Sequence, residues 1–120
     1  MPPKRTVIPG RDVAVSLPPS SAGSASRRAW DGIRALAVVE TAGWRLWGRE
    51  RADYTARYPE LELLRRLPAR TLVDGELVAF DAVGRPDLPR LLRRHGLTDA
   101  WRIRQARHWC LVRYVVFDLL

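Results

Sequence analysis

Residues that favour β-strands gather in four stretches of the chain. The first two, residues 33–40 and 44–47, flank a turn segment at residues 41–43, and this arrangement predicts a β-hairpin. Residues 71–80 alternate the polar Asp74 and Glu76 with Leu77, Val78 and Phe80, and they predict another strand. Residues 111–119 are rich in Val and Leu and predict a further strand.

Leucines at helical spacing predict helices between these strands. Residues 60–67 carry apolar side chains three and four positions apart. Asp87 is a residue type that caps helix N-termini, and residues 88–94 behind it are expected to form a short helix. Its apolar stripe consists of Leu88, Leu91 and Leu92. Residues 98–107 are expected to form a third helix. Together the elements predict an α+β fold, built mainly on antiparallel sheet with flanking helices.

The N-terminal segment has a different composition. Residues 18–26 are a tract of Pro, Ser, Gly and Ala, which buries too little apolar area to offset the entropy of ordering the chain. We therefore divide the chain into a mobile Pro/Ser-rich segment at 1–28 and a folded part at 29–120.

Cysteine and histidine usage excludes several classes of protein. The single Cys110 rules out an internal disulfide or a cysteine-based metal site, and we expect it to be buried. His95 and His108 have no partners at ligand spacing. No apolar run approaches the roughly 20 residues of a membrane span, and no signal peptide is indicated. A cytoplasmic protein with no membrane partner is the expectation.

The chain is strongly basic, with a net charge of +8 and a pI of about 11.1. Such a balance suits a polyanionic partner such as DNA. All of its basic residues except Lys4 are arginines, however, and with the many Ala, Gly and Pro this skew is equally typical of a GC-rich genome. Both explanations of the charge stay open.

Four motifs follow one another in a familiar order: AWDGIR at residues 29–34, RERADYTARYPEL at 49–61, LVDGELVAFD at 72–81 and YVVFDLL at 114–120. The chain thereby resembles the adenylation (nucleotidyltransferase) domain of the ATP-dependent DNA-repair ligases, over residues 30–120. The resemblance implies the N-terminal half of a DNA ligase/mRNA-capping-type nucleotidyltransferase domain. It also implies the activity of that family, the ATP-driven sealing of DNA nicks in repair and recombination.

The nucleophile of that chemistry is missing. In the family the first motif begins with a lysine, whose amine attacks the α-phosphorus of ATP to form a lysyl-AMP. Ala29 stands in its place and has only a methyl group. Arg28 stays protonated, Trp30 is not nucleophilic, and Lys4 lies far upstream. We expect no catalytic residue and no self-adenylation. Arg27, where the family usually has an acid, favours decay or a local frame disturbance over a designed substitution.

The other motif positions are retained, and the resemblance gives each a role. Arg34 and Arg49 would face the ribose and phosphates of the nucleotide, or the nick phosphate in the case of Arg49. Glu76 would contact the ribose and the metal, since carboxylate oxygens suit Mg²⁺. Phe117 would stack on adenine. The expected nucleotide-binding residues are Trp30, Asp31, Gly32, Arg34, Arg49, Glu76 and Phe117, with Glu76 as the metal ligand.

Parts of the hairpin and the second motif are expected to be structural. Asp53, Tyr54 and Arg57 match a family segment that we interpret as fixing a loop by hydrogen bonds. Gly48 departs from the Ser that usually precedes the motif arginine. Two tryptophans are expected to pack rather than to stack on bases: Trp44 and Trp47.

By resemblance, the cofactors are ATP and Mg²⁺, and the partner is nicked double-stranded DNA. The later motifs of the family and its OB-fold are not among these 120 residues. We therefore expect a fragment that is inactive alone, with a separate chain that completes the domain as a further partner. A non-catalytic nucleic-acid-binding remnant is the main alternative. A relative of the RNA-capping guanylyltransferases and an unexpressed product are the others, and the DYTxR and FDLL matches favour the ligase branch.

Overall fold

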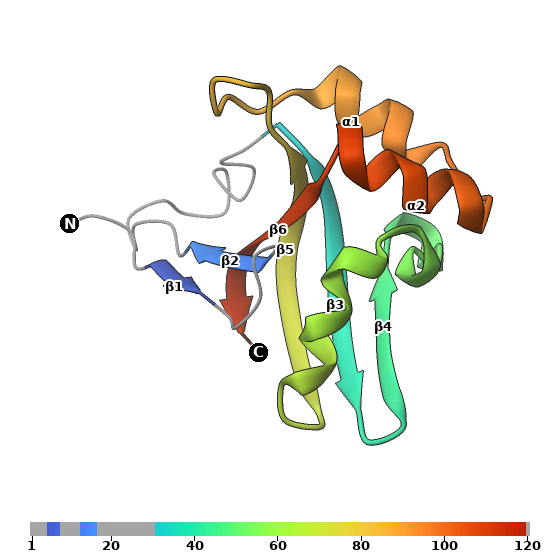
Figure 1. Cartoon of the computed structure of the whole chain (residues 1–120). Helices are drawn as coiled ribbons and strands as arrows, with labels where there is room; N and C mark the ends of the chain where they lie inside the picture. Colours follow the sequence, from blue (N-terminus) through green and yellow to red (C-terminus); the bar gives the residue numbers. More distant parts are fainter. Residues whose placement is uncertain (1–4, 8–12, 17–30, 120) are drawn as a thin grey trace.

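The chain folds into one mixed sheet with helices on one of its faces (Figure 1). The computed structural model describes residues 5–7, 13–16 and 31–119. The strands are Arg5–Val7 (β1), Val13–Ser16 (β2), Ile33–Glu40 (β3), Gly43–Trp47 (β4), Thr71–Ala79 (β5) and Val112–Leu119 (β6), in the spatial order β1-β2-β6-β5-β3-β4. The helices are Arg49–Arg51 (η3), Thr55–Arg57 (η4), Pro59–Arg66 (η5), Leu88–His95 (α1) and Ala100–Trp109 (α2).

The α+β class and the mainly antiparallel sheet are confirmed. The expected hairpin is β3 and β4, closed by the pair Glu40 and Gly43. The strands expected at 71–80 and 111–119 are β5 and β6, which pair antiparallel with each other. All three helices are found, but η5 is a 3₁₀ helix.

The N-terminal region corrects one prediction, because no strand was expected within residues 1–28. β1 and β2 form an antiparallel pair there, and β2 continues the sheet by pairing parallel to β6. Both strands are short, and β6, the partner of β2, lies about a hundred residues away in sequence. No local pattern therefore predicts these two strands. The rest of this segment, including the Pro/Ser tract that we expected to be mobile, lies outside the described residues.

The main core fills the face of the sheet that the helices cover. Alternate side chains of β3, β5 and β6 point to this face, as the two-residue period of a strand requires. They pack against leucines from η5 and α1. The cluster includes Ala35, Ala37, Leu46, Leu61, Leu64, Val73, Leu77, Leu91, Val112, Tyr114 and Val116.

A fully buried ion pair lies inside this layer. Both Nη atoms of Arg94 bind the carboxylate of Glu60, at 2.6 and 2.7 Å. The same guanidinium donates to the carbonyl oxygens of Arg57 and Cys110. Glu60 also accepts from the backbone N–H of Val112, at the start of β6. The pair therefore joins η5, α1 and β6.

Arg94 also explains a wrong prediction about α1. The leucine stripe was expected to include Leu92, but this side chain is 53% exposed. Leu91 and Arg94 point inward instead, three positions apart. Hydrophobicity alone cannot predict this, because it assigns an arginine to the solvent face.

Two smaller predictions are confirmed. Cys110 is 2% exposed within the main core, and burial raises the pKa of its thiol. The side chain of Asp87 accepts a hydrogen bond from the backbone N–H of Arg90 and caps α1.

In the described part of the chain, no helix combines the length and the apolar character that a membrane crossing needs.

The buried ion pair generates a stability prediction. Arg94→Met leaves the Glu60 carboxylate buried without its counter-charge, so we expect the free energy of unfolding to fall by about 3–5 kcal/mol. The double variant Glu60→Leu/Arg94→Met removes both charges and should recover most of this loss. Chemical denaturation followed by circular dichroism measures both.

The matched control is Arg65→Met, which breaks an ion pair between two largely exposed side chains, Arg65 and Glu62. Its effect should stay below about 1 kcal/mol. A double variant no more stable than Arg94→Met would contradict this account of the pair.

Candidate nucleotide-binding face

The face of the sheet away from the helices carries the retained motif side chains. Arg34 on β3 lies opposite Glu76 on β5 in the antiparallel register. Asp74 lies two positions before Glu76 and thus on the same face of β5. Phe117 packs with Val78 on this side, in an apolar cluster separate from the main core. The fold thus brings residues from three motifs onto one surface.

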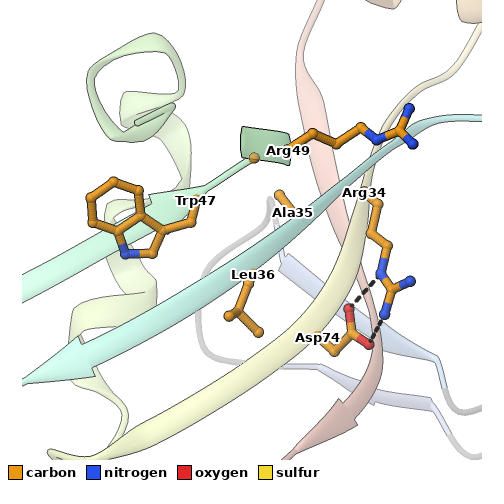
Figure 2. A pocket seen from close by; sticks show the side chains of 7 residues that line it. Arg34, Ala35, Leu36, Trp47, Arg49 and Asp74 are labelled. Atoms are coloured by element: carbon orange, nitrogen blue, oxygen red, sulfur yellow. Dashed lines mark hydrogen bonds and ion pairs between the residues drawn. The ribbon is translucent and has the colours of Figure 1, made fainter. Parts of the chain in front are cut away.

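Arg34 and Asp74 form a two-pronged ion pair across β3 and β5 (Figure 2). Arg34 Nε donates to Asp74 Oδ1 at 3.1 Å, and Nη2 donates to Oδ2 at 2.8 Å. Such bidentate contacts fix the plane of a guanidinium. The hydrogen bonds that Arg34 donates to Asp74 raise the pKa of Arg34, and the nearby charge of Glu76 acts in the same direction. The Arg34 side chain is still 48% exposed, so an oriented cation faces the solvent.

Glu76 is fully buried, beneath the entry to β3. A Cβ at Gly32 would overlap the carbonyl oxygen of Leu77 and lie 2.8 Å from Cγ of Glu76. Only a glycine allows this close approach of the backbone. Among residues 5–7, 13–16 and 31–119, no group of three or more His, Cys, Asp or Glu side chains is placed to hold a metal ion.

A register shift in β6 places Phe117. Gly75 pairs with Val116 and Asp74 pairs with Asp118, so Phe117 has no partner position on β5. Such a bulge leaves one residue outside the ladder and redirects side chains locally. Phe117 is 7% exposed and packs with Val78 and Val115.

Arg49 lies at the mouth of a cavity of about 370 Å³ that also includes Arg34, Asp74 and Trp47 in its wall (Figure 2). Its side chain is exposed. A neighbouring cavity of about 550 Å³ again contains both arginines, together with Leu92 of α1. The two motif arginines, 15 positions apart in sequence, therefore share two adjoining hollows.

The turn behind Arg49 is strained. Glu50 and Arg51 have φ angles of 56° and 60°, a region that costs a non-glycine residue about 1 kcal/mol or more. The turn lets Gly48 N–H donate to the carbonyl oxygen of Ala52. Gly48 is required because a Cβ there would overlap the ring of Tyr54.

The loop-fixing role of the second motif is confirmed. Asp53 accepts from the backbone N–H and the hydroxyl of Thr55, at 2.9 and 2.6 Å. Arg57 donates to the carbonyl oxygen of His95 at 3.1 Å and lies 3.2 Å from its Nε2. Since a guanidinium only donates, Nε2 accepts and Nδ1 carries the proton, which it donates to the Tyr58 hydroxyl at 2.6 Å. Burial and the Arg57 charge lower the pKa of His95.

Ala29 and Trp30 lie outside the described residues, and Asp31 is exposed just ahead of β3. Sequence reasoning missed two contributors to this face. Asp74 was known only as part of the third motif, although its two-residue spacing from Glu76 could have placed both carboxylates on one side. Trp44 packs against the core as expected, whereas Trp47 lines the cavity beside Arg34.

A family model described as the ATP dependent DNA ligase domain matches residues 21–120. The chain belongs to this ligase domain family. The ancestry expected from the four motifs is confirmed, and the match begins nine residues before residue 30, where the resemblance was placed.

Curated relatives and a solved structure agree with the ligase assignment. A probable DNA ligase of Beutenbergia cavernae is 42% identical over 81 residues, which is 66% of this chain and 14% of the relative. The multifunctional non-homologous end joining protein LigD of Pseudomonas aeruginosa is 35% identical over 91 residues, which is 74% of this chain and 10% of the relative. A structure of mycobacterial DNA ligase D complexed with ATP and MES superimposes with a TM-score of 0.56 and 31% identity, over 76% of this chain and 27% of that one. The ligase-family chain thus spans a small part of each relative.

Bovine Insulin-like 3 also aligns, at 30% identity over 117 residues, which is 95% of this chain and 89% of its own length. The ligase motifs, the family model and the superimposed ligase structure all point the other way. The ligase assignment therefore stands.

Gly32 offers a test of the close approach over Glu76. In Gly32→Ala the new methyl group overlaps backbone, so we expect the free energy of unfolding to fall by about 1–3 kcal/mol. The control is Gly96→Ala, whose Cβ would meet nothing closer than 3.7 Å at a φ of −73°. It should be neutral or stabilising by less than about 1 kcal/mol. Equal effects of the two substitutions in urea titrations would refute the packing argument.

The lowered pKa of His95 predicts a pH dependence. The unfolded chain has an ordinary histidine that gains a proton near pH 6.5, before the folded one does. Stability should therefore decrease as the pH falls from 7 through 6.5, and this decrease should shrink in His95→Gln. The exposed His108→Gln is the control and should keep the wild-type slope. Thermal melts between pH 7.5 and 5.5 decide the question, and identical slopes in all three proteins would sink the prediction.

Proposed function

We propose that this chain is a nucleotide-binding part of a ligase adenylation domain that holds ATP without becoming adenylated itself. The observation that carries the proposal is the oriented Arg34–Asp74 pair, on the same face as Glu76 and Phe117. Planar guanidinium groups recognise phosphate oxygens by paired hydrogen bonds. Arg34, whose orientation Asp74 fixes, and the exposed Arg49 are the groups we assign to the phosphates or ribose.

The proposed remaining contacts follow the motif roles. Phe117 would meet the adenine ring, for which its bulge position on the open face is suitable. Glu76 is the motif residue for the ribose hydroxyl groups, but it is fully buried in this structure, so we assign it no direct contact. Asp31 and Gly32 would line the entry to this face, and the motif assigns Trp30 to the nucleotide as well.

Mg²⁺ does not fit the described residues as a protein-held ion. The carboxylate of Asp74 is engaged by Arg34, and Glu76 has no further acid or histidine grouped with it among residues 31–119. We therefore assign no metal site to this face and derive no step from the ion.

Self-adenylation is not part of the proposal, because Ala29 lacks an amine. The ATP-driven sealing of nicked duplex DNA belongs to the family. We propose that these 120 residues bind the nucleotide, and that sealing requires another polypeptide segment that supplies the remaining motifs.

Binding without covalent transfer is directly testable. We expect ATP to bind the purified chain reversibly in calorimetry, and Arg34→Ala to weaken this binding about tenfold or more, since a charge-assisted contact is worth about 1.5–3 kcal/mol. Arg66→Ala, on η5 away from the face, should bind like the wild type. ATP labelled at its α-phosphate should leave no label on the denatured chain.

Two results would overturn this function: no detectable ATP binding, or a covalent adduct on the unaltered chain. Ala29→Lys extends the test. We expect it to seal no nicks alone, because only part of the active site is present. A lysyl-AMP adduct in this variant would show that the face presents the α-phosphorus to residue 29.

A further inference from the structure

Helix α2 carries an unbalanced positive charge. It contains three arginines and a histidine, and no acid between its ends. Only Ile103 and Ala106 are buried, so every other side chain of the helix is exposed. Basic residues three and four positions apart on a helix repel one another. The basic residues are Arg102, Arg104, Arg107 and His108.

These charges have no acidic partners within the described part of the chain. The ion pairs found there involve Arg34, Arg45, Arg65, Arg90 and Arg94, but none of the arginines of α2. The 3₁₀ helix η5 provides a contrast, since Arg65 lies 3.2 Å from Glu62. Within the described residues, the positive charge of α2 is therefore available to an anionic partner.

Two tryptophans stand among the arginines. Trp101 is 60% exposed and Trp109 is 44% exposed. They lie eight positions apart with Gln105 midway, so all three form one stripe along the helix. The stripe is about 12 Å long, which corresponds to three or four nucleotides at the stacking distance of about 3.4 Å.

The neighbouring groups extend this surface. The guanidinium of Arg93, from α1, lies 5.9 Å from the centre of the Trp109 ring. Arg104, Arg107 and His108 line a cavity of about 490 Å³. Guanidinium groups beside a hollow are suited to phosphate oxygens, which they bind by paired hydrogen bonds.

From this juxtaposition we propose that α2 is a binding surface for single-stranded nucleic acid. Arg104 and Arg107 contact phosphates, and unpaired bases stack on Trp101 and Trp109. Exposed aromatic rings between cations are the means by which proteins hold single strands, because every base has a face that stacks. In a duplex these faces are covered, so the tryptophans favour a single strand. None of these residues lines the cavities beside Arg34, and the surface goes beyond the proposed nucleotide binding.

The test uses a fluorescent 20-nucleotide single strand, the duplex of the same sequence, and the full 120-residue chain without ATP. Trp101→Ala should weaken single-strand binding about tenfold and leave duplex binding within about twofold. Trp101→Phe keeps an aromatic face and should bind within about twofold of the wild type. Fluorescence anisotropy over a range of salt concentrations gives both affinity and salt dependence.

The arginines are tested by Arg104→Gln/Arg107→Gln. Removing two phosphate contacts should reduce the slope of log K against log salt by about 1.4. The matched control, Arg65→Gln/Arg66→Gln, removes the same charge from η5 and should keep the slope. Melting temperatures confirm that each variant is folded, which is expected because all the altered side chains are exposed.

Three outcomes would overturn the proposal: no binding of the single strand at low salt, an unchanged affinity in Trp101→Ala, or equal losses in the two double-arginine variants. The last would mean that net charge alone attracts the strand. Because ATP is absent, a failure here leaves nucleotide binding at Arg34 untouched. Loss of ATP binding, in turn, leaves the α2 result standing.

Discussion

The buried pair of Glu60 and Arg94 is the constraint on which the helical layer depends. Two charges without solvent need well-aimed hydrogen bonds, and removing either charge leaves a large uncompensated cost. The two Nη atoms of Arg94 reach Glu60 and the carbonyl oxygens of Arg57 and Cys110, whereas its Nε has no hydrogen-bond partner among the described residues. Glu60 in turn holds the first residue of β6, Val112. The pair therefore fixes the relative positions of η5, α1 and β6. Burial of leucines alone would not specify these positions, because it has no preferred direction.

Tyr114 of β6 connects the helical layer to the two central strands, β3 and β5. Tyr114 is buried, and its hydroxyl lies 2.6 Å from the carbonyl oxygen of Ala35 and 2.8 Å from that of Val73, so its one proton is shared between β3 and β5. Its ring occupies the space in which a Cβ of Gly75 would stand, 2.8 Å from Cζ. Burial raises the pKa of this phenol, which keeps it a donor. The central strands are thereby locked at the point where Asp74 faces Arg34.

Local signals were sufficient for most of the fold and for part of the face. The turn at residues 41–43 and the cap at Asp87 act within a few residues, and both were predicted. The missed features all depend on distant partners. The inward turn of Arg94 requires Glu60, 34 positions away, and the bulge at Phe117 is visible only once β5 is paired. The bidentate grip of Asp74 on Arg34 likewise needs the β3–β5 register, which no spacing along the chain encodes.

The same contacts explain how motifs persist where the nucleophile does not. Gly32 is required by the carbonyl oxygen of Leu77, and Gly75 by the ring of Tyr114. Asp74 holds Arg34, an interaction within the sheet that involves no substrate. Each of these motif residues therefore has a packing role in addition to any chemical one. A lysine at position 29 would serve the chemistry, whereas Gly32, Asp74 and Gly75 make their contacts with residues of β3, β5 and β6. If the proposal is correct, substitution by alanine removes only self-adenylation, and the packing roles of the other motif residues are unaffected.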